Sequence, residues 1–338
     1  MKITSNNSHQ AIEPWLALPA KVRWKLFRQF QSPEQLRVNP RFANSHGVID
    51  DLRFSWQSVQ VISDTHSRKL LLENGEGVRC EAVALLPAKI ANATRKARAT
   101  ACISSQPGCG VGCPFCATGT LGYRGNLSAI EIVEQVYWAG VQAAQADRQL
   151  RNVVFMGMGE PMHNLDNVLQ AIDCLTDERL FGIAQRRILV STVGVPRAML
   201  ELVTKFSGVR LALSLHSALP EQRRVLVPRA VADLDVLRDT IRRVSKLQSE
   251  SVWIEVVLLA GVNDSLEHAQ SLITFCEGLR VEVNLIPYNS TNVAVAYRAS
   301  EKEVREGFAM KLREAGIRTT IRRSLGEDAS AACGQLTT

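Results

Sequence analysis

The stretch from Cys102 to Cys116 constrains this chain more than any other part of its sequence. It holds three cysteines at C-x3-C-x2-C spacing, Cys109, Cys113 and Cys116, with Cys102 a short distance upstream. Three closely spaced thiolates can bind three irons of a 4Fe-4S cluster and leave the fourth iron open to a ligand that is not protein. Zinc is the alternative, but zinc sites usually show two separated cysteine pairs or a histidine partner, and no histidine lies near these cysteines. The spacing therefore favours an iron–sulfur cluster over zinc or over buried thiols without metal.

This cysteine loop has a defined place in the expected fold. After Arg98, strand-like segments alternate with helix-like segments, which is typical of a parallel sheet. Ser128 and Glu131 form a capping-box pattern that supports the first helix. The pattern fits an α/β fold, either an incomplete (β/α)6 barrel or a doubly wound sheet, and in both the chemistry lies at the carboxyl ends of the strands. We expect strands over 99–104, 152–156, 187–191, 209–215, 252–259 and 282–286, and helices over 128–144, 165–175, 196–205, 234–248, 266–278 and 301–315.

Residues 1–97 are expected to form a small N-terminal accessory region, and residues 98–338 the barrel with its C-terminal cysteine segment. Apolar residues recur at helical spacing between Pro19 and Phe30, and the remainder of that segment is basic. Later segments alternate like antiparallel strands, with a turn at Asn74-Gly75. The expected parts are a loose terminus over residues 1 to about 12, one helix over 19–30, strands over 54–62, 69–73 and 78–86, and an exposed connection over 88–98.

Whole-chain charge favours an anionic partner. The sequence has 40 Lys and Arg against 33 Asp and Glu, a formal net charge of +7 at pH 7. A basic surface is typical of proteins that bind RNA or DNA, although any single basic pair is also typical of a solvated surface. The clusters are Arg95, Lys96 and Arg98; Arg186 and Arg187; Arg223 and Arg224; Arg242 and Arg243; and Arg322 and Arg323.

Other features of the sequence argue against membrane and secreted classes. No apolar run reaches the roughly 18 residues that span a bilayer, and residues 1–10 lack the apolar stretch of a signal peptide. Eight cysteines without a secretion signal argue against a disulfide framework and for a reducing compartment. We expect a cytoplasmic monomer with no membrane contact.

Small polar residues recur where the expected strands end. After the second strand comes Gly157-Met-Gly-Glu-Pro161, in which two glycines let a ligand approach the backbone and Glu160 can accept from a charged amino group. The third glycine of a dinucleotide fingerprint is absent. Each residue alone is more typical of a structural hydrogen-bonding group than of a ligand contact, but their recurrence favours one common ligand. The others are Ser191, Ser214, His216 and Asn289.

A further cysteine lies close to the end of the chain, in Ala331-Ala-Cys-Gly-Gln-Leu336. Small neighbours allow such a segment to move, so Cys333 is either an inert thiol or a reactive one. Cys80, Cys174 and Cys276 have no comparable context and are interpreted as packing residues.

Together these motifs resemble the radical S-adenosylmethionine enzymes and, more narrowly, the RlmN/Cfr family of RNA adenine methyltransferases. The resemblance covers roughly residues 78–336 and implies an incomplete radical SAM barrel. It is carried by Cys102-Ile-Ser-Ser-Gln with the three cysteines, Gly157-Met-Gly-Glu-Pro, Ser214-Leu-His, Gly261-Val-Asn-Asp, Asn284-Leu-Ile-Pro-Tyr-Asn and Ala331-Ala-Cys-Gly-Gln-Leu.

The resemblance also implies a set of site residues. The three cysteines of the motif would bind a 4Fe-4S cluster whose open iron is chelated by S-adenosyl-L-methionine. Cys333 would be the methyl-accepting cysteine, Cys102 the resolving thiol that forms a transient disulfide with it, and Glu81 the proton acceptor. Contacts to S-adenosylmethionine would come from Gly159, Glu160, Ser191, Ser214, Leu215, His216 and Asn289.

In the family that the motifs resemble, the methyl group reaches a ring carbon of adenine by a detour. The cysteine thiolate first takes a methyl group from S-adenosylmethionine. A second S-adenosylmethionine, cleaved reductively at the cluster, gives a 5′-deoxyadenosyl radical that activates the S-methyl group for addition to the base. The second cysteine resolves the resulting protein–RNA adduct, and reducing partners such as flavodoxin and thioredoxin support the cycle. The implied substrate is 23S rRNA, with tRNA as a further candidate.

Several alternatives stay open at the level of sequence. Gly157-Met-Gly-Glu-Pro resembles the branch that methylates adenine C2, whereas Leu180-Phe-Gly-Ile, Ser214-Leu-His-Ser and Tyr288-Asn-Ser-Thr resemble the C8-methylating resistance branch. C2 is the primary hypothesis. A radical SAM enzyme with a non-RNA substrate, or a non-catalytic cluster protein that binds RNA or senses redox state, are the rivals. The chain also departs from the family in its short N-terminal region and in Ala329-Ser330.

Overall fold

One ten-stranded sheet runs through the chain, with its strands in sequence order from β1 to β10. The structure, a computed structural model, describes residues 7–88, 97–230, 232–291, 293, 296–322 and 331–337, with side chains from residue 12 onward. Residues 89–96 of the expected connection, the cluster members Arg95, Lys96 and Arg323, and Ala329-Ser330 lie outside the described residues.

The second part of the sheet is parallel and forms an incomplete barrel. Each strand from β4 onward pairs in parallel with the next. Among the strands of the described residues, β10 pairs with β9 alone and β1 with β2 alone, so this sheet does not close on itself. The six expected parallel strands are confirmed, and the short strand β10 was missed. The strands are β4 (Arg98–Cys102), β5 (Gln149–Phe155), β6 (Ile188–Thr192), β7 (Arg210–Ser214), β8 (Val252–Leu258), β9 (Val281–Pro287) and β10 (Thr319–Ile321).

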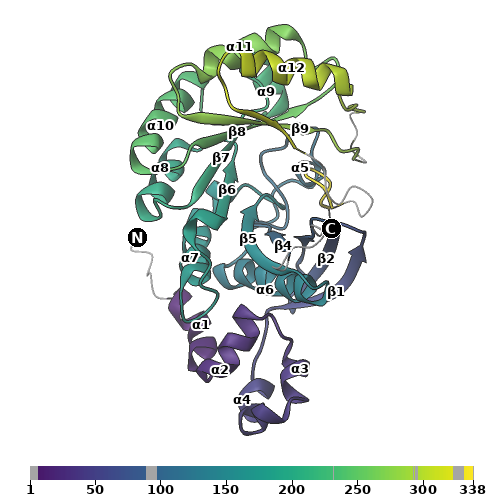
Figure 1. Cartoon of the computed structure of the whole chain (residues 1–338), viewed down its shortest axis with the longest axis vertical. Helices are drawn as coiled ribbons and strands as arrows, with labels where there is room; N and C mark the ends of the chain where they lie inside the picture. Colours follow the sequence, from purple (N-terminus) through teal and green to yellow (C-terminus); the bar gives the residue numbers. More distant parts are fainter. Residues whose placement is uncertain are drawn as a thin grey trace.

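Helices connect these strands and lie on the outer side of the curved sheet (Figure 1). All six expected helices are present, and Ser128 and Glu131 make the expected capping box at the start of α6. Two short helices, α5 (Ala117–Thr120) and α9 (Pro220–Leu226), were not expected. The six longer helices are α6 (Ala129–Gln145), α7 (Leu165–Thr176), α8 (Pro196–Lys205), α10 (Leu234–Leu247), α11 (Leu266–Cys276) and α12 (Lys302–Glu314).

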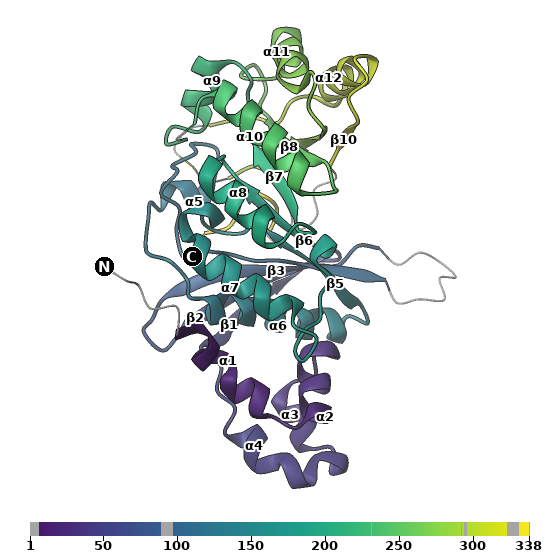
Figure 2. The ribbon, with the colours of Figure 1, turned by 90° about the vertical axis from the view of Figure 1, so that its left-hand side faces the viewer.

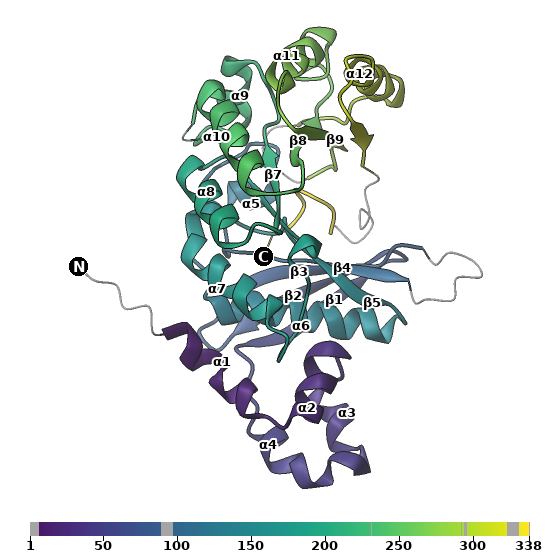
Figure 3. The same cartoon turned by 60° about the vertical axis from the view of Figure 1, so that its left-hand side comes forward.

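The N-terminal part continues the same sheet. Three antiparallel strands, β1 (Trp56–Ser63), β2 (Ser67–Asn74) and β3 (Arg79–Leu85), were expected and are present. β3 pairs antiparallel with β4, which joins them directly to the barrel. α6 lies between this part of the sheet and a group of N-terminal helices (Figure 2; Figure 3).

Two expectations for the N-terminal helices were wrong. The terminus is helical from Asn7 rather than loose up to residue 12, and the region holds more than one helix. Aromatic side chains explain why it folds, because Trp15 contacts Phe27 at a centroid distance of 4.9 Å and Phe54 stacks on Tyr137 of α6 at 4.6 Å. The helices are α1 (Asn7–Ala17), α2 (Ala20–Arg23) with a π turn over Trp24–Arg28, α3 (Pro33–Arg37) and α4 (His46–Asp50). None of the helices in the described residues has the length and apolar character of a membrane span.

Candidate active site

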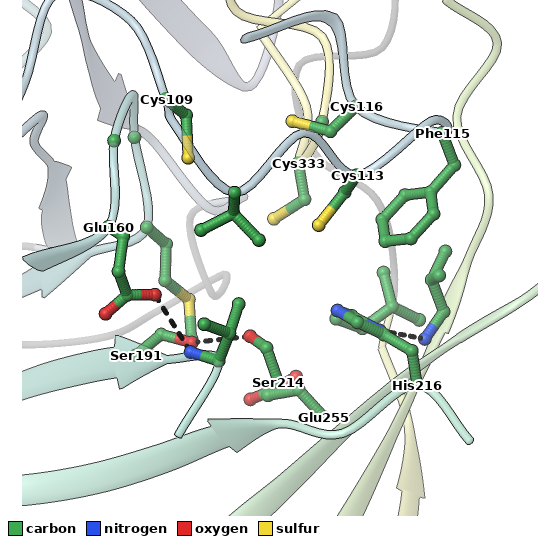
Figure 4. Close-up of a pocket in the computed structure, with 18 of the residues that line it drawn as sticks. Cys109, Cys113, Phe115, Cys116, Glu160, Ser191, Ser214, His216, Glu255 and Cys333 are labelled. Atoms are coloured by element: carbon green, nitrogen blue, oxygen red, sulfur yellow. Dashed lines mark hydrogen bonds between the residues drawn. The ribbon is translucent and has the colours of Figure 1, made fainter. Parts of the chain in front are cut away.

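The three cysteines of the C-x3-C-x2-C motif lie in the loop between β4 and α5, at the carboxyl end of the first parallel strand. Their thiols line one cavity of about 170 Å³, which we call the front cavity (Figure 4). Gly119 of α5 lets the loop wind tightly, since a Cβ there would lie 2.7 Å from the Cys113 carbonyl oxygen. The tight turn after β4 therefore brings the three motif thiols to the same cavity.

Burial keeps these thiols protonated until a metal binds. It raises the pKa of Cys109 to about 12 and also raises the pKa of Cys113 and Cys116. Repulsion between neighbouring thiolates adds to the rise at Cys109 and Cys113. Because metals bind thiolate rather than thiol, loading this site must release protons.

The Gly157-Met-Gly-Glu-Pro segment follows β5 and forms another wall of the front cavity. Side chains are excluded at both glycines: a Cβ at Gly157 would lie 2.6 Å from Ser104 Oγ, and one at Gly159 would lie 2.6 Å from Gln106 Cβ. Glu160 is 3% exposed, and its carboxylate accepts from the backbone N–H groups of Met162 at 2.9 Å and Val193 at 2.8 Å. Burial raises the pKa of Glu160, and these donors oppose the rise.

The ends of β6 and β7 complete the cavity. Ser191 Oγ and Ser214 Oγ are 3.0 Å apart, and both line it. His216 follows with a φ of 59°, its Nδ1 accepts from Val257 N at 3.2 Å, and its ring meets Phe115 edge-on at 4.9 Å. Burial, assisted by the Arg223 charge, lowers the pKa of His216 to about 3, so the imidazole is neutral at physiological pH.

The C-terminal segment places Cys333 in the same cavity, beside the three motif cysteines (Figure 4). Contacts from distant parts of the chain hold this segment. Ala117 N donates to Gly334 O at 2.8 Å, Thr118 Oγ1 donates to Leu336 O at 2.7 Å, and Asn289 Nδ2 donates to Cys333 O at 3.1 Å. Helix α5, which directly follows the cysteine motif, and Asn289 therefore position Cys333.

Cys333 also lines a second, smaller cavity of about 40 Å³, which it shares with Cys102; we call it the linking cavity. Burial raises the pKa of Cys102 to about 12, with a further rise from the nearby Cys333 thiol and an opposing effect of Arg322. All eight cysteines of the structure are free thiols. Two reduced thiols from opposite ends of the barrel sequence thus face one small space.

Comparison with known proteins agrees with this arrangement. The family model described as the radical SAM superfamily matches residues 103–273. A probable RNA methyltransferase of Rhodopirellula baltica is 46% identical over 317 residues, 94% of this chain and 81% of that protein. A probable dual-specificity RNA methyltransferase RlmN of Chlorobium chlorochromatii is 37% identical over 327 residues, 95% of this chain and 82% of that protein. A crystal structure of a radical SAM methyltransferase from Sphaerobacter thermophilus superposes with a TM-score of 0.84, at 34% identity over 94% of this chain and 92% of that one.

This chain belongs to the RlmN-type RNA methyltransferases of the radical SAM superfamily. Membership implies a 4Fe-4S cluster and S-adenosylmethionine, and the residues of the front cavity fit both groups. The three thiols would supply three of the four iron ligands that a cube needs. Gly157 and Gly159 line the cavity without side chains, next to the buried Glu160 carboxylate, which can accept hydrogen bonds from an amino group. Among the described residues, no group of three or more His, Cys, Asp or Glu side chains is arranged to hold a single metal ion.

Four of the expected site residues of this RlmN-type methyltransferase lie outside the front cavity: Cys102, which lines the linking cavity, and Glu81, Leu215 and Asn289. Glu81 is 4% exposed on β3, ion-paired to Lys69 at 3.2 Å, and its Oε2 accepts from Thr337 N at 2.8 Å. It is therefore a buried carboxylate in contact with the C-terminal segment. Leu215 is fully buried and offers only its backbone, while Asn289 lines the linking cavity.

Two charged residues of the front cavity were missed as site residues. Glu255 on β8 is 1% exposed; Asn284 Nδ2 donates to its Oε2 at 2.8 Å, and its Oε1 has no hydrogen-bond partner among the described residues. Burial raises the pKa of Glu255 to about 7, and Arg322 opposes the rise. Arg322, just after β10, faces Cys333, Glu255 and Cys102, whose charges raise its pKa. A charged residue inside the apolar run of β8 was the available signal for Glu255.

Proposed function

We propose that this RNA methyltransferase methylates a ring carbon of adenine, C2 in 23S rRNA with tRNA as a further target, through a methylated Cys333. One observation carries the proposal: Cys333 lines both the front cavity, with the three motif thiols, and the linking cavity, with Cys102. Direct transfer of a methyl group to an sp2 carbon needs neither a carrier cysteine nor a second thiol. Transfer through a cysteine that becomes bonded to the base needs that cysteine and a second thiol that releases it.

The positions of the cavity residues support a set of cofactor contacts. Cys109, Cys113 and Cys116 would hold the cluster, and the walls of the front cavity would hold S-adenosylmethionine. When bound there, S-adenosylmethionine supplies a methyl group and, after one-electron reduction at the cluster, a radical that removes a hydrogen atom. The proposed walls are Gly159, Glu160, Ser191, Ser214 and His216, with Leu215 contributing backbone and Asn289 positioning Cys333.

Cys333 and Cys102 then have different roles, as the carrier and as the resolving thiol. Cys333 Sγ carries the carbon that becomes bonded to the adenine ring. The radical that this addition leaves on the ring gives up one electron, for which the oxidised cluster would be the acceptor, and a base removes the ring proton. Cys102 thiolate attacks Cys333 Sγ, so that an S–S bond forms as the S–C bond breaks, and the carbon leaves with the electron pair and takes up a proton. The chain is left with a Cys102–Cys333 disulfide, which an external dithiol of the thioredoxin class reduces. A cytoplasmic location, where such reductants and flavodoxin-type electron donors occur, belongs to the same proposal.

Glu81 is our proposed proton acceptor. Burial raises the pKa of Glu81, which improves its ability to hold a proton, while its pairing with Lys69 acts in the opposite direction. Because Thr337 N occupies its Oε2, a nucleotide can reach that oxygen only after the last residues of the segment shift.

The proposal is tested by separating the two thiols. Cys333→Ala should give neither methylated RNA nor a covalent adduct, because the carrier is gone. Cys102→Ala should accumulate RNA attached through Cys333, seen as a nuclease-sensitive slow band on a denaturing gel, because the thioether cannot leave. A fully active, adduct-free Cys102→Ala enzyme would contradict the proposal.

Mass spectrometry of rRNA nucleosides from cells with and without the gene identifies the product. C2-methyladenosine that depends on the gene is the expected result. C8-methyladenosine would assign the chain to the alternative branch, and no methyladenosine in either position would favour a non-RNA substrate or a non-catalytic role.

A further inference from the structure

A third cavity, of about 610 Å³, lies inside the barrel at the amino ends of the parallel strands; we call it the rear cavity. The same inward-facing rows of side chains line it and the front cavity. On β7, Arg210 lines the rear cavity and Ser214 the front one, and on β8 Trp253 lines the rear cavity and Glu255 the front one. Residues an even number of positions apart share a strand face, so the two cavities are two ends of one lumen.

The linking cavity joins these two ends at the reactive thiols. Met156 and Arg322 line all three cavities, and Arg322 Nη1 lies 3.5 Å from Met156 Sδ. These two unbranched side chains therefore form the partition between the rear cavity and the space that holds Cys102 and Cys333. A group that moves them aside from the rear reaches Cys333 directly.

Among the described residues, the lining of the rear cavity carries more positive than negative side chains. Its lining includes five arginines but only two glutamates. Both glutamates already face arginines, Glu250 at 3.9 Å from Arg210 and Glu282 at 3.3 Å from Arg318. The lining arginines are Arg186, Arg187, Arg210, Arg318 and Arg322.

Several positively charged side chains lie near Arg187. Within the described residues neither Arg186 nor Arg187 has a carboxylate partner, and Arg186 is exposed at the mouth. Burial lowers the pKa of Arg187, and the neighbouring charges of Arg151, Arg186 and Arg98 lower it further. Guanidinium groups stay charged at physiological pH. Such a cluster repels itself until an anion with several negative charges binds to it.

An aromatic surface lies inside this ring of charge. The Arg210 guanidinium carbon is 4.5 Å from the Trp253 ring centroid, and Trp253 Nε1 has no hydrogen-bond partner among the described residues. Stacked Arg and Trp side chains are the surfaces on which unpaired bases of single-stranded RNA stack. Phosphate-binding arginines together with a stacking platform favour RNA over a simple anion.

We propose that the RNA substrate reaches Cys333 through the rear cavity, as an unpaired segment whose phosphates bind Arg186 and Arg187 while the target base passes Arg210–Trp253 toward Met156 and Arg322. This inference rests on the proposed RNA methyltransferase function. The front cavity is not available as a route, because its thiols and strand-end residues hold the cluster and S-adenosylmethionine in that proposal. The RNA base and S-adenosylmethionine thus approach Cys333 from opposite ends of one lumen.

The test compares two charge reversals of equal size. Arg186→Glu/Arg187→Glu changes the mouth of the rear cavity, whereas Arg242→Glu/Arg243→Glu changes an exposed pair on α10. Binding of a labelled single-stranded 12-nucleotide oligoadenylate is measured by fluorescence anisotropy over a range of salt concentrations. Loading of Cys333 with a methyl group, which needs no RNA, is measured on the same holoenzymes by mass spectrometry.

Reversal at the rear cavity should weaken oligoadenylate binding about 10-fold or more and lower the salt slope by about 1.4, the value for two lost single-strand phosphate contacts. Methyl loading of Cys333 should stay unchanged, and the α10 pair should bind within about twofold of wild type. Equal weakening by both pairs, or none by either, would overturn the inference. Should the double reversal fail to fold, Arg186→Ala, at an exposed side chain, should still weaken binding.

The failure of this inference is distinct from failure of the proposed function. Wild-type enzyme that methylates rRNA while Arg186→Glu/Arg187→Glu methylates it equally well would refute the rear route alone. Wild-type enzyme that methylates no RNA would refute the function itself. Salt-insensitive oligoadenylate binding by wild type would show that the arginines contact no phosphate.

Discussion

Replacing Lys69 by Met should destabilise this protein, because it leaves a buried carboxylate without its counter-ion. Lys69 Nζ lies 3.2 Å from Glu81 Oε1, and the two side chains are 9% and 5% exposed. In the register of β2 and β3, Leu71 faces Glu81 and Lys69 faces Val83, so the ion pair is a diagonal contact across the sheet. Removing one partner of a buried ion pair costs about 3–5 kcal/mol.

That free energy corresponds to a measurable change in melting temperature. Unfolding entropy is about 2.1 cal/mol/K per residue, which gives about 0.7 kcal/mol/K for a chain of 338 residues. Lys69→Met should therefore lower Tm by about 4–7 °C at pH 8, measured by circular dichroism. Lys205→Met is the matched control: its ion pair with Asp173 is 44% and 52% exposed, and an exposed pair contributes at most about 1 kcal/mol, or roughly 1 °C.

The pH dependence of the Lys69→Met effect has a definite sign. Burial raises the pKa of Glu81 and Lys69 lowers it, so removal of Lys69 raises that pKa further. A carboxyl whose pKa is higher in the folded state binds its proton more tightly there. The folded state is then favoured most below the unfolded pKa and loses stability as pH rises through the folded pKa. The Tm deficit of Lys69→Met should therefore shrink as pH falls from 8 toward 5.

Lys69→Met/Glu81→Gln provides the decisive comparison, because it removes both charges. This double variant should recover most of the stability lost in Lys69→Met. If it is as unstable as Lys69→Met, or if the deficit of Lys69→Met is the same at every pH, lost lysine contacts rather than an unpaired charge are the cause. Either result would refute the reasoning.

Two further predictions concern the site itself. Anaerobically reconstituted enzyme should bind about four irons, and replacing any one cysteine of the C-x3-C-x2-C motif by Ala should abolish the cluster. The control variant Cys174→Ala, at a buried residue of α7, should keep the cluster. Stoichiometric zinc without iron-dependent absorbance would contradict the assignment. Thr118→Val removes the hydrogen bond to Leu336 O, which is worth about 0.5–1.5 kcal/mol. This variant should load Cys333 with a methyl group about 2- to 10-fold more slowly, at unchanged iron content. An unchanged rate would mean that the other contacts position the C-terminal segment without this hydrogen bond.

Local sequence signals were sufficient for most of the fold. Strand and helix patterns after Arg98 predicted the order of the parallel strands, because each strand is a short apolar run bounded by polar turns. α1 was not predictable in this way, since it contains Pro14 and begins with polar residues. It forms because Ile12 and Trp15 are buried against the rest of the chain, and such tertiary burial overrides local propensity. β10 is too short to show a periodic pattern.

The contacts of buried charged side chains could not be predicted from the sequence around them. The two partners of Glu81 come from β2 and from the last residues described, and the sequence around Glu81 indicates neither of them. Arg322 was interpreted as half of a basic surface pair, yet it lies among Met156, Cys102 and Cys333, which are far away in sequence. Each of these environments depends on which strands become neighbours, and no spacing within one segment records that.

The inward-facing rows of the barrel show what the sequence does and does not encode. On β8, Ile254, Val256 and Leu258 are buried on the helix side, and this apolar row dictates that Trp253 and Glu255 face the lumen. A slip of one residue would turn both toward the helices and remove the rear-cavity platform and the front-cavity carboxyl together. The apolar row therefore fixes the register for both cavities at once. The lumen side of each strand is left free to carry charge, and its chemistry emerges only when the neighbouring strands bring their own lumen residues alongside.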